Sequence, residues 1–191
     1  MCSTTTASGK GTGSAPAMPT IIYQVAMSLD GYIADVDGGV DWLPEGGADD
    51  YGYQEFYAGV VALVMGRRTY DQAISFDQWL FTGKPIYVFT SNPPEDNPHD
   101  VRFVQSDPAD FVRDVASQYE GMVWLLGGAN LAEQFRRDDL IDEYMLHVMP
   151  TILGRGVPLF GGDAPHTALE LVATRAFDDG VVMLHYRRAG A

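Results

Sequence analysis

Two adjacent arginines, Arg67 and Arg68, follow a run of apolar residues in a chain that carries few positive charges. The 191 residues include 12 Lys and Arg against 26 Asp and Glu, so the formal net charge is −14 at pH 7. A guanidinium group can bind two oxygens of a phosphate monoester at once. With Gly66 before the pair and Thr69 after it, the segment suggests an anion site, although a surface arginine pair is more often simply solvated.

A second turn with residues suited to a phosphate contains Gly127 and Gly128. It follows another apolar run and leads into a helix-compatible stretch that starts with Ala129 and Asn130. Glycines let a pyrophosphate approach the free N–H groups of a helix start, where the helix dipole favours negative charge. The alternative is that the two glycines form only a tight turn.

A third turn contains Thr90 and Ser91, whose hydroxyl groups can donate hydrogen bonds to the same anion. Each turn alone has an ordinary structural explanation. Because all three follow apolar runs that read as strands, together they predict a ligand that carries phosphate. The additional arginine favours the 2′-phosphate of NADP over NAD.

The segments that must position these turns alternate between two patterns. Apolar, β-branched and aromatic runs predict strands at 20–28, 60–65, 84–91, 101–105, 122–128, 142–150, 168–177 and 181–188. Helix-compatible stretches are found at 48–59, 69–75, 107–121 and 130–140. Asp107 and Pro108 are typical of a helix start, with the aspartate as the cap and the proline at the first helical position.

This alternation predicts an α/β fold with a mixed, mainly parallel sheet covered by helices on both faces. The last two strands are separated by residues 178–180, which read Asp-Asp-Gly, and are predicted to form a C-terminal antiparallel hairpin. Ligands of such sheets bind beyond the carboxyl ends of the strands. We therefore expect the three turns to lie together at that edge.

The composition excludes several classes of function. A pI of about 4.4 argues against nucleic acid and anionic membranes as partners. No apolar run approaches the roughly 20 residues that span a bilayer. The only cysteine is Cys2, and the four histidines are widely separated, so no metal site is predicted.

The domain organisation expected from the composition is simple. Residues 1–19 are rich in Ser, Thr, Gly and Ala, lack the pattern of a secretory signal and are predicted to form a disordered tail. Residues 20–191 are predicted to form a single domain, and we expect the protein to be cytoplasmic.

Four segments resemble the dihydrofolate reductase superfamily, above all the reductase domain of the bifunctional riboflavin-biosynthesis deaminase-reductase and its stand-alone relatives. They are AMSLDGYIA at 26–34, VMGRRTY at 64–70, WLLGGANL at 124–131 and DEYMLHVMPTILGRGVPLF at 142–160. The resemblance implies a dihydrofolate-reductase-like three-layer fold, NADPH bound across the sheet and a homodimer.

The resemblance also assigns roles to individual residues. It implies that NADPH is bound by Gly66, Arg67, Thr69, Thr90, Ser91, Gly127 and Gly128. To these we add Arg68, the second arginine of the pair, and Ala129 and Asn130, which follow the two glycines. The resemblance implies that Ser28 and Asp30 lie beside the nicotinamide and the substrate, with Asp30 important for turnover. The substrate mouth would include Leu153, Gly154 and Gly156, and Arg155 between them is our choice for a contact to a substrate phosphate.

The resemblance leaves the substrate open. The first hypothesis is a riboflavin-type reduction of a ribosylamino-pyrimidine to its ribitylamino product, with a small molecule as the only partner besides a second copy. The chain has no His/Cys zinc signature of the deaminase half, which weakens the transfer of the family's substrate to this chain. The alternative is dihydrofolate reduction, in which Asp50 would bind the amidine edge of a pterin, unless Asp49 and Asp50 only favour the helix dipole.

Two further alternatives remain. Trp42 is placed at the substrate mouth, but its side chain could equally fill an apolar core. A protein that binds NADP(H) without turnover would keep the same three turns. NADPH oxidation across a panel of substrates separates that protein from an enzyme.

Overall fold

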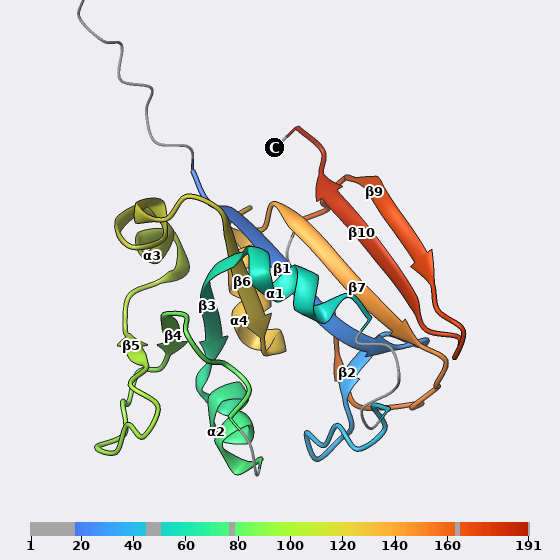
Figure 1. Cartoon of the computed structure of the whole chain (residues 1–191), viewed down its shortest axis with the longest axis horizontal. Coiled ribbons are helices and arrows are strands. Elements are labelled where there is room, and N and C mark those ends of the chain that lie inside the picture. The colour runs from blue at the N-terminus through green and yellow to red at the C-terminus, as the bar shows by residue number, and fades with distance from the viewer. Residues whose placement is uncertain (1–17, 45–50, 77–78, 163–164, 191) are drawn as a thin grey trace, which may run out of the picture.

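The computed structural model describes residues 18–44, 51–76, 79–162 and 165–190 of the chain. Its centre is an eight-stranded sheet with the order β5-β4-β3-β6-β1-β7-β10-β9. The first six of these strands pair in parallel, whereas β10 and β9 are antiparallel to their neighbours (Figure 1). The bounds are β1 (Thr20–Ser28), β3 (Val60–Gly66), β4 (Ile86–Phe89), β5 (Arg102–Val104), β6 (Met122–Gly127), β7 (Glu143–Met149), β9 (Leu169–Ala176) and β10 (Val182–Arg188).

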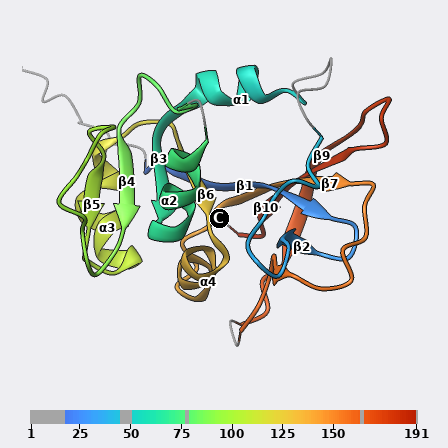
Figure 2. The same ribbon diagram turned by 90° about the horizontal axis from the view of Figure 1, so that it is seen from below.

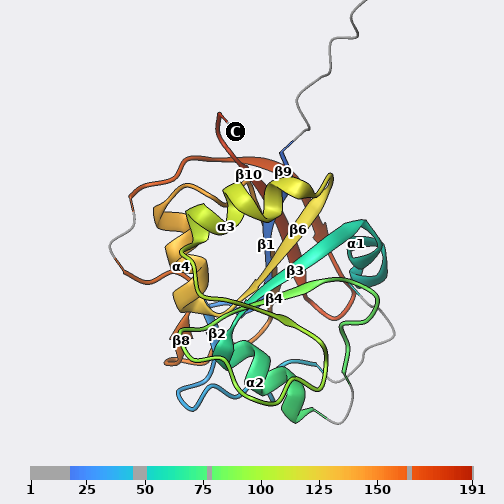
Figure 3. The same cartoon turned by 90° about the vertical axis from the view of Figure 1, so that its left-hand side faces the viewer.

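Helices cover both faces of the parallel strands. Figures 2 and 3 show α1 (Tyr53–Gly59) on one side and α3 (Pro108–Asp114) and α4 (Ala129–Arg137) on the other. The helix α2 (Arg67–Ser75) packs on the α1 side through Tyr70. The predicted three-layer fold with its C-terminal antiparallel hairpin is therefore confirmed.

The strands β3 and β6 are apolar without interruption because both of their faces are buried. In β3, Leu63 and Met65 pack on the α1 side with Phe56 of α1. Ala62 and Val64, which alternate with them, pack on the α4 side in the cluster that contains Phe135. The same alternation in β1 and β6 divides the core into two layers with the sheet between them.

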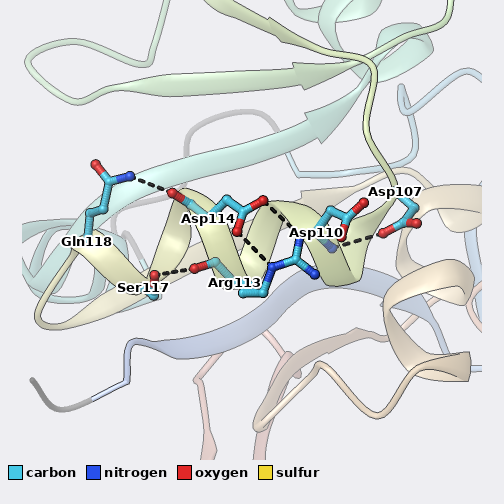
Figure 4. A network of polar contacts seen from close by, with 6 residues as sticks. All are labelled: Asp107, Asp110, Arg113, Asp114, Ser117 and Gln118. Carbon is cyan, nitrogen blue, oxygen red and sulfur yellow. Dashed lines mark hydrogen bonds and ion pairs between the residues drawn. The ribbon is translucent and has the colours of Figure 1, made fainter. Parts of the chain in front are cut away.

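The predicted start of α3 is confirmed. Figure 4 shows the Asp107 carboxylate accepting a hydrogen bond from the backbone N–H of Asp110, at 2.9 Å, and Pro108 takes the first helical position. On the exposed side of the helix, Arg113 pairs with Asp110 and Asp114. The helix ends earlier than predicted, at Asp114, and a short 3₁₀ turn (Ala116–Gln118) follows.

A small second sheet was not predicted from the sequence. The strand β2 (Tyr32–Ala34) pairs antiparallel with β8 (Val157–Pro158), although both segments read as turns and loops. A Cβ atom on Gly156 would lie 2.2 Å from the Ala34 carbonyl oxygen, so only glycine permits this approach. Strands this short depend on a distant partner, which local periodicity does not reveal.

Three helix starts differ from the predicted ones. The helix α1 begins at Tyr53, after Gly52 in the left-handed conformation with φ of 80°. Asp49 and Asp50, predicted to stand at its start, lie outside the described residues. The helix α2 begins at Arg67 instead of Thr69, and α4 begins at Ala129.

The predicted tail lies, up to residue 17, outside the described residues, and β1 begins at Thr20. Within the part of the chain that the structure describes, no helix has the length and apolar character required to cross a membrane.

Candidate active site

The three predicted ligand turns lie side by side at the carboxyl edge of the sheet. In the ladder Gly66 pairs with Phe89, which precedes Thr90, and Met65 pairs with Gly127. A Cβ atom on Gly66 would lie only 3.7 Å from the backbone nitrogen of Gly128. The strand order β4-β3-β6 thus brings together turns that are far apart in the sequence.

Two helices begin at this edge without a side-chain cap. Gly66 and Gly128 stand before α2 and α4, and neither helix start receives a hydrogen bond from a capping side chain. The first turn of α2 contains Arg67 and Arg68 and no acidic residue. Two positive side chains at the positive end of a helix dipole repel that dipole unless an anion lies between them. The arrangement therefore suits a phosphate group.

The two arginines differ in their surroundings. The Nε atom of Arg67 lies 2.7 Å from Oδ1 of Asp71, and its Nη1 donates to the Asn92 carbonyl oxygen at 3.2 Å. The exposed Arg68 has no hydrogen-bond or ion-pair partner among the described residues. Arg68 is thus the side chain with its full donor capacity available to a ligand.

The remaining residues of the three turns also lie at the carboxyl edge of the sheet. A Cβ atom on Gly128 would lie 3.2 Å from the hydroxyl oxygen of Thr69, so the two turns are in close contact. The Thr90 hydroxyl accepts a hydrogen bond from the backbone N–H of Asn92, and Ser91 is exposed beside it. Ala129 and Asn130 form the first turn of α4. All ten residues assigned to NADPH therefore lie on these three neighbouring turns.

Asp30 joins two loops at the carboxyl ends of β1 and β7. Its carboxylate accepts hydrogen bonds from the Ser28 hydroxyl at 2.6 Å and from the backbone N–H groups of Leu153 and Gly154, at 3.1 and 2.7 Å. The buried Ser28 hydroxyl also accepts from the N–H of Tyr32, at 3.0 Å. These contacts, with the Ser28 hydrogen bond as the largest, lower the pKa of the Asp30 carboxyl.

The structure brings together most of the residues expected at the substrate mouth. Leu153, Gly154, Arg155 and Gly156 form the loop that Asp30 holds, and Gly154 adopts a positive φ of 73°. The Arg155 side chain is exposed. Asp50, the proposed pterin ligand, lies outside the described residues.

A pocket of about 140 Å³ lies between α1 and the strands β1 and β7. Its floor is made by the paired residues Gln24 and Met145, then Ala26 and His147, with Met149 at the strand end. Its other walls are Tyr51, Gly52, Tyr53 and Phe56. Sequence reasoning missed this pocket because its floor residues alternate along strands and resemble ordinary core. The signal that could have found it is the pair of polar residues, Gln24 and His147, within otherwise apolar strands.

His147 is a neutral hydrogen-bonding group in the pocket floor. Burial lowers the pKa of its imidazole, and a hydrogen bond to the Tyr51 carbonyl oxygen offsets part of that effect. Nδ1 lies 3.4 Å from the Gln24 amide nitrogen, which can only donate, so Nδ1 accepts. Nε2, at 3.3 Å from the Tyr51 oxygen, then carries the proton. The imidazole is therefore a neutral hydrogen-bonding group that lines the pocket.

Trp42 lies beside this pocket. It packs against the cluster of Met149, Phe177 and Val181, where Ala26 and Tyr51 also pack. Its indole nitrogen is buried without a hydrogen-bond partner. Trp42 therefore both fills an apolar cluster, as the alternative required, and holds an unused donor next to the pocket. Among the described residues, no group of three His, Cys, Asp or Glu side chains is placed to hold a metal ion.

The chain matches a known protein family and is similar to proteins of several bacteria. Residues 71–183 match the family described as RibD C-terminal domain. The chain is 37% identical to the uncharacterized protein YwjB of Bacillus subtilis (strain 168) over 172 residues, which cover 89% of this chain and 98% of YwjB. The putative riboflavin biosynthesis protein from Shewanella sp. PV-4 is 31% identical, with a TM-score of 0.79 and coverage of 88% of this chain and 98% of that one.

Two more distant structures share the fold alone. A diaminohydroxyphosphoribosylaminopyrimidine deaminase/5-amino-6-(5-phosphoribosylamino)uracil reductase from Thermotoga maritima is 18% identical, with a TM-score of 0.70 over 90% of this chain and 57% of that one. A dihydrofolate reductase from Enterococcus faecalis, complexed with NADP(H), is 19% identical, with a TM-score of 0.62 over 89% of this chain and 96% of that one. They agree with the predicted dihydrofolate-reductase-like fold.

We predict that His147 makes the stability of the protein depend on pH. The folded state holds the imidazole neutral, whereas in the unfolded chain it binds a proton near its ordinary pKa of about 6.5. Acid therefore favours unfolding, and this contribution to stability is lost as the pH falls through 6.5. Denaturant unfolding at pH 7 and pH 5 should show a smaller loss of stability in His147→Gln than in the wild type. The exposed His166 is the matched control, and His166→Gln should keep the wild-type loss. An equal loss in both variants would contradict the prediction.

Proposed function

Because this chain belongs to the RibD C-terminal domain family, we propose that it is an NADPH-dependent reductase of a pyrimidine substrate of the 5-amino-6-(5-phosphoribosylamino)uracil type. The family match and the dihydrofolate-reductase-like fold indicate an oxidoreductase. The observation that carries the finer proposal is the position of a mainly apolar pocket with two polar floor residues, Gln24 and His147. It lies over β1 and β7, next to the three phosphate-suited turns that follow β4, β3 and β6. A dinucleotide on those turns can extend toward the pocket because β1 directly follows β6 in the sheet.

The residues of the three turns fit the phosphates of NADPH. The uncapped start of α4 behind Gly127 and Gly128 would bind the pyrophosphate, and the start of α2 would bind the 2′-phosphate of the adenosine. Arg68 would contribute its free guanidinium to that phosphate. When bound, the cofactor supplies the hydride, and the protein supplies orientation and a site that excludes water.

The pocket over β1 and β7 fits a neutral heteroaromatic ring. The Gln24 side chain carries both an amide donor and an amide acceptor, which match the N–H and C=O of a cyclic lactam such as uracil. His147 orients that amide through its Nδ1 atom, and Phe56 and Met145 give the ring apolar contacts. This fit supports a pyrimidine over the alternative substrate. A pterin amidine pairs best with a carboxylate, and the described lining residues contain none.

Asp30 is proposed as a positioning residue. Its carboxylate oxygens are engaged by three donors of the protein and its pKa is lowered, so it would stay ionised and hold the loop of Leu153 and Gly154 at the pocket rim. Any importance of Asp30 for turnover would then arise from the position of that loop. Trp42 would support the pocket from behind, through its packing against Met149 in the neighbouring apolar cluster.

A second copy of the chain is proposed as a further partner. The C-terminal hairpin exposes every residue of β9, including Leu171, which is 57% exposed. In the ladder Leu171 opposes Tyr186, which packs with the α4-side core, so this face of the hairpin is apolar. Phe160, 48% exposed, lies near Tyr144 on the same side. A two-fold contact would cover the same apolar patch on both copies.

Our first prediction from this proposal concerns the reaction itself. The purified protein should oxidise NADPH when 5-amino-6-(5-phosphoribosylamino)uracil is added, and dihydrofolate should give little or no oxidation. Absorbance of NADPH provides the measurement. Turnover of dihydrofolate without turnover of the pyrimidine would favour the alternative enzyme. Binding of NADPH without oxidation in the presence of either substrate would favour a protein that has lost turnover.

A second prediction concerns the choice of cofactor. Arg68→Ala should weaken NADPH binding by about tenfold or more and leave NADH binding nearly unchanged, because one charge-assisted contact to a phosphate contributes about 1.5–3 kcal/mol. Fluorescence titration of both cofactors measures the effect. Arg155→Ala, which removes another exposed arginine without an ion-pair partner among the described residues, serves as the control. Equal affinity of the wild type for NADH and NADPH would refute the assignment of a 2′-phosphate site.

A third prediction concerns the dimer. Leu171→Lys should shift the protein from dimer to monomer, since it places a charge at the centre of the apolar patch on the hairpin. Size-exclusion chromatography with light scattering measures the mass. Ile152→Lys, which changes an even more exposed apolar residue on the loop after β7, should leave the dimer intact. A wild-type protein that is monomeric at high concentration would rule out this partner.

A further inference from the structure

One row of residues crosses the sheet from the pocket floor to its outer strand. Ala26 of β1 pairs with His147 of β7, His147 pairs with Met183 of β10, and Met183 pairs with Arg175 of β9. Residues that are directly opposed in a sheet project from the same face. Because Ala26 and His147 line the pocket, Arg175 projects on the pocket side of the sheet. Arg175 lies two strands beyond His147, so the backbones at the two residues are about 10 Å apart.

Aromatic side chains connect the pocket wall with Arg175. The Arg175 guanidinium lies over the ring of Phe177, 4.5 Å from its centroid. The buried Phe177 ring is 5.1 Å from the ring of Tyr51, a wall of the pocket, and 6.5 Å from the imidazole of His147. A planar guanidinium held on an aromatic face loses less freedom when it binds an anion. The guanidinium is therefore partly ordered on the Phe177 ring, which packs against Tyr51 in the wall of the pocket.

Arg175 is also unusual among the cations of this acidic chain. Five described arginines form ion pairs with a carboxylate, namely Arg67, Arg113, Arg136, Arg187 and Arg188. The described arginines that neither form such a pair nor bond to another side chain are Arg68, Arg137, Arg155 and Arg175. Arg68 lies at the cofactor turns, Arg137 ends α4 on the opposite face, and Arg155 lies on the loop after β7.

We propose that Arg175 binds an anionic group, a phosphate monoester, at the end of the substrate whose ring occupies the pocket. The inference rests on the proposed function, since it concerns the substrate of the same site. His147 and Arg175 are separated by two strand spacings. A five-carbon sugar can bridge this distance between a ring that contacts His147 and a phosphate that contacts Arg175. The guanidinium would donate two parallel hydrogen bonds to the phosphate oxygens. Arg175 thereby takes the role that the sequence alone assigned to Arg155.

Kinetics with paired substrates test the proposal. The substrates are the 5′-phosphorylated ribosylamino-pyrimidine and its dephosphorylated form, at saturating NADPH, with wild type, Arg175→Ala, Arg175→Lys and Arg155→Ala. In Arg175→Ala, KM for the phosphorylated substrate should rise about tenfold or more, and kcat/KM for the dephosphorylated one should stay constant. Arg175→Lys should recover part of the loss because it restores the charge. Arg155→Ala should preserve the wild-type preference for the phosphorylated substrate.

A binding measurement separates this inference from the proposed function. Ribose 5-phosphate is titrated into wild type, Arg175→Ala and Arg155→Ala, with calorimetry as the readout and without any substrate ring. If wild type reduces neither pyrimidine, the proposed function fails, but ribose 5-phosphate binding that is lost only in Arg175→Ala still supports an anion contact at Arg175. Equal binding to wild type and Arg175→Ala, a loss only in Arg155→Ala, or no binding to wild type would overturn the inference.

Discussion

The architecture depends on the parallel ladder of β4, β3, β6, β1 and β7, with both faces buried. Parallel strands must all end at one edge, and the helices that return the chain must cover both faces. Every turn that follows a strand of this ladder therefore lies at the same edge of the sheet. The proximity of Gly66 and Gly128 is a direct result, since a Cβ atom on Gly66 would lie in van der Waals contact with the backbone nitrogen of Gly128, at 3.7 Å. The proposed cofactor site follows from this convergence.

The arginines of this acidic chain differ in whether a carboxylate lies beside them. Five of the ten described arginines pair with nearby carboxylates, so those without a side-chain partner among the described residues mark places where the protein can attract an anion. Arg68 stands at the start of a helix, where the dipole adds to its field. Arg175 stands on the sheet, where an aromatic ring adds a flat support. His147, whose pKa is lowered by burial, adds a neutral imidazole to the floor of the pocket.

Asp30 connects two loops at the carboxyl edge of the sheet through its hydrogen bonds. A carboxylate that accepts from Ser28 and from two backbone N–H groups fixes the loop after β7 against the turn after β1. After this loop the chain forms β8, which pairs with β2 in the short second sheet, and Gly156 lies against Ala34 there. These contacts connect the two strands that form the pocket floor, so the rim and the floor are held by one set of interactions.

The sequence by itself determined the class of fold, the strand-helix order, the capped start of α3 and the three turns at the carboxyl edge, because each depends on local periodicity or on residues adjacent in the chain. It did not determine the β2–β8 pair, the start of α2 at Arg67, the pocket floor of Gln24 and His147 or the row that ends at Arg175. These features depend on which strands become neighbours and in which register. Only the tertiary structure decides that, since strand pairing joins residues more than a hundred positions apart.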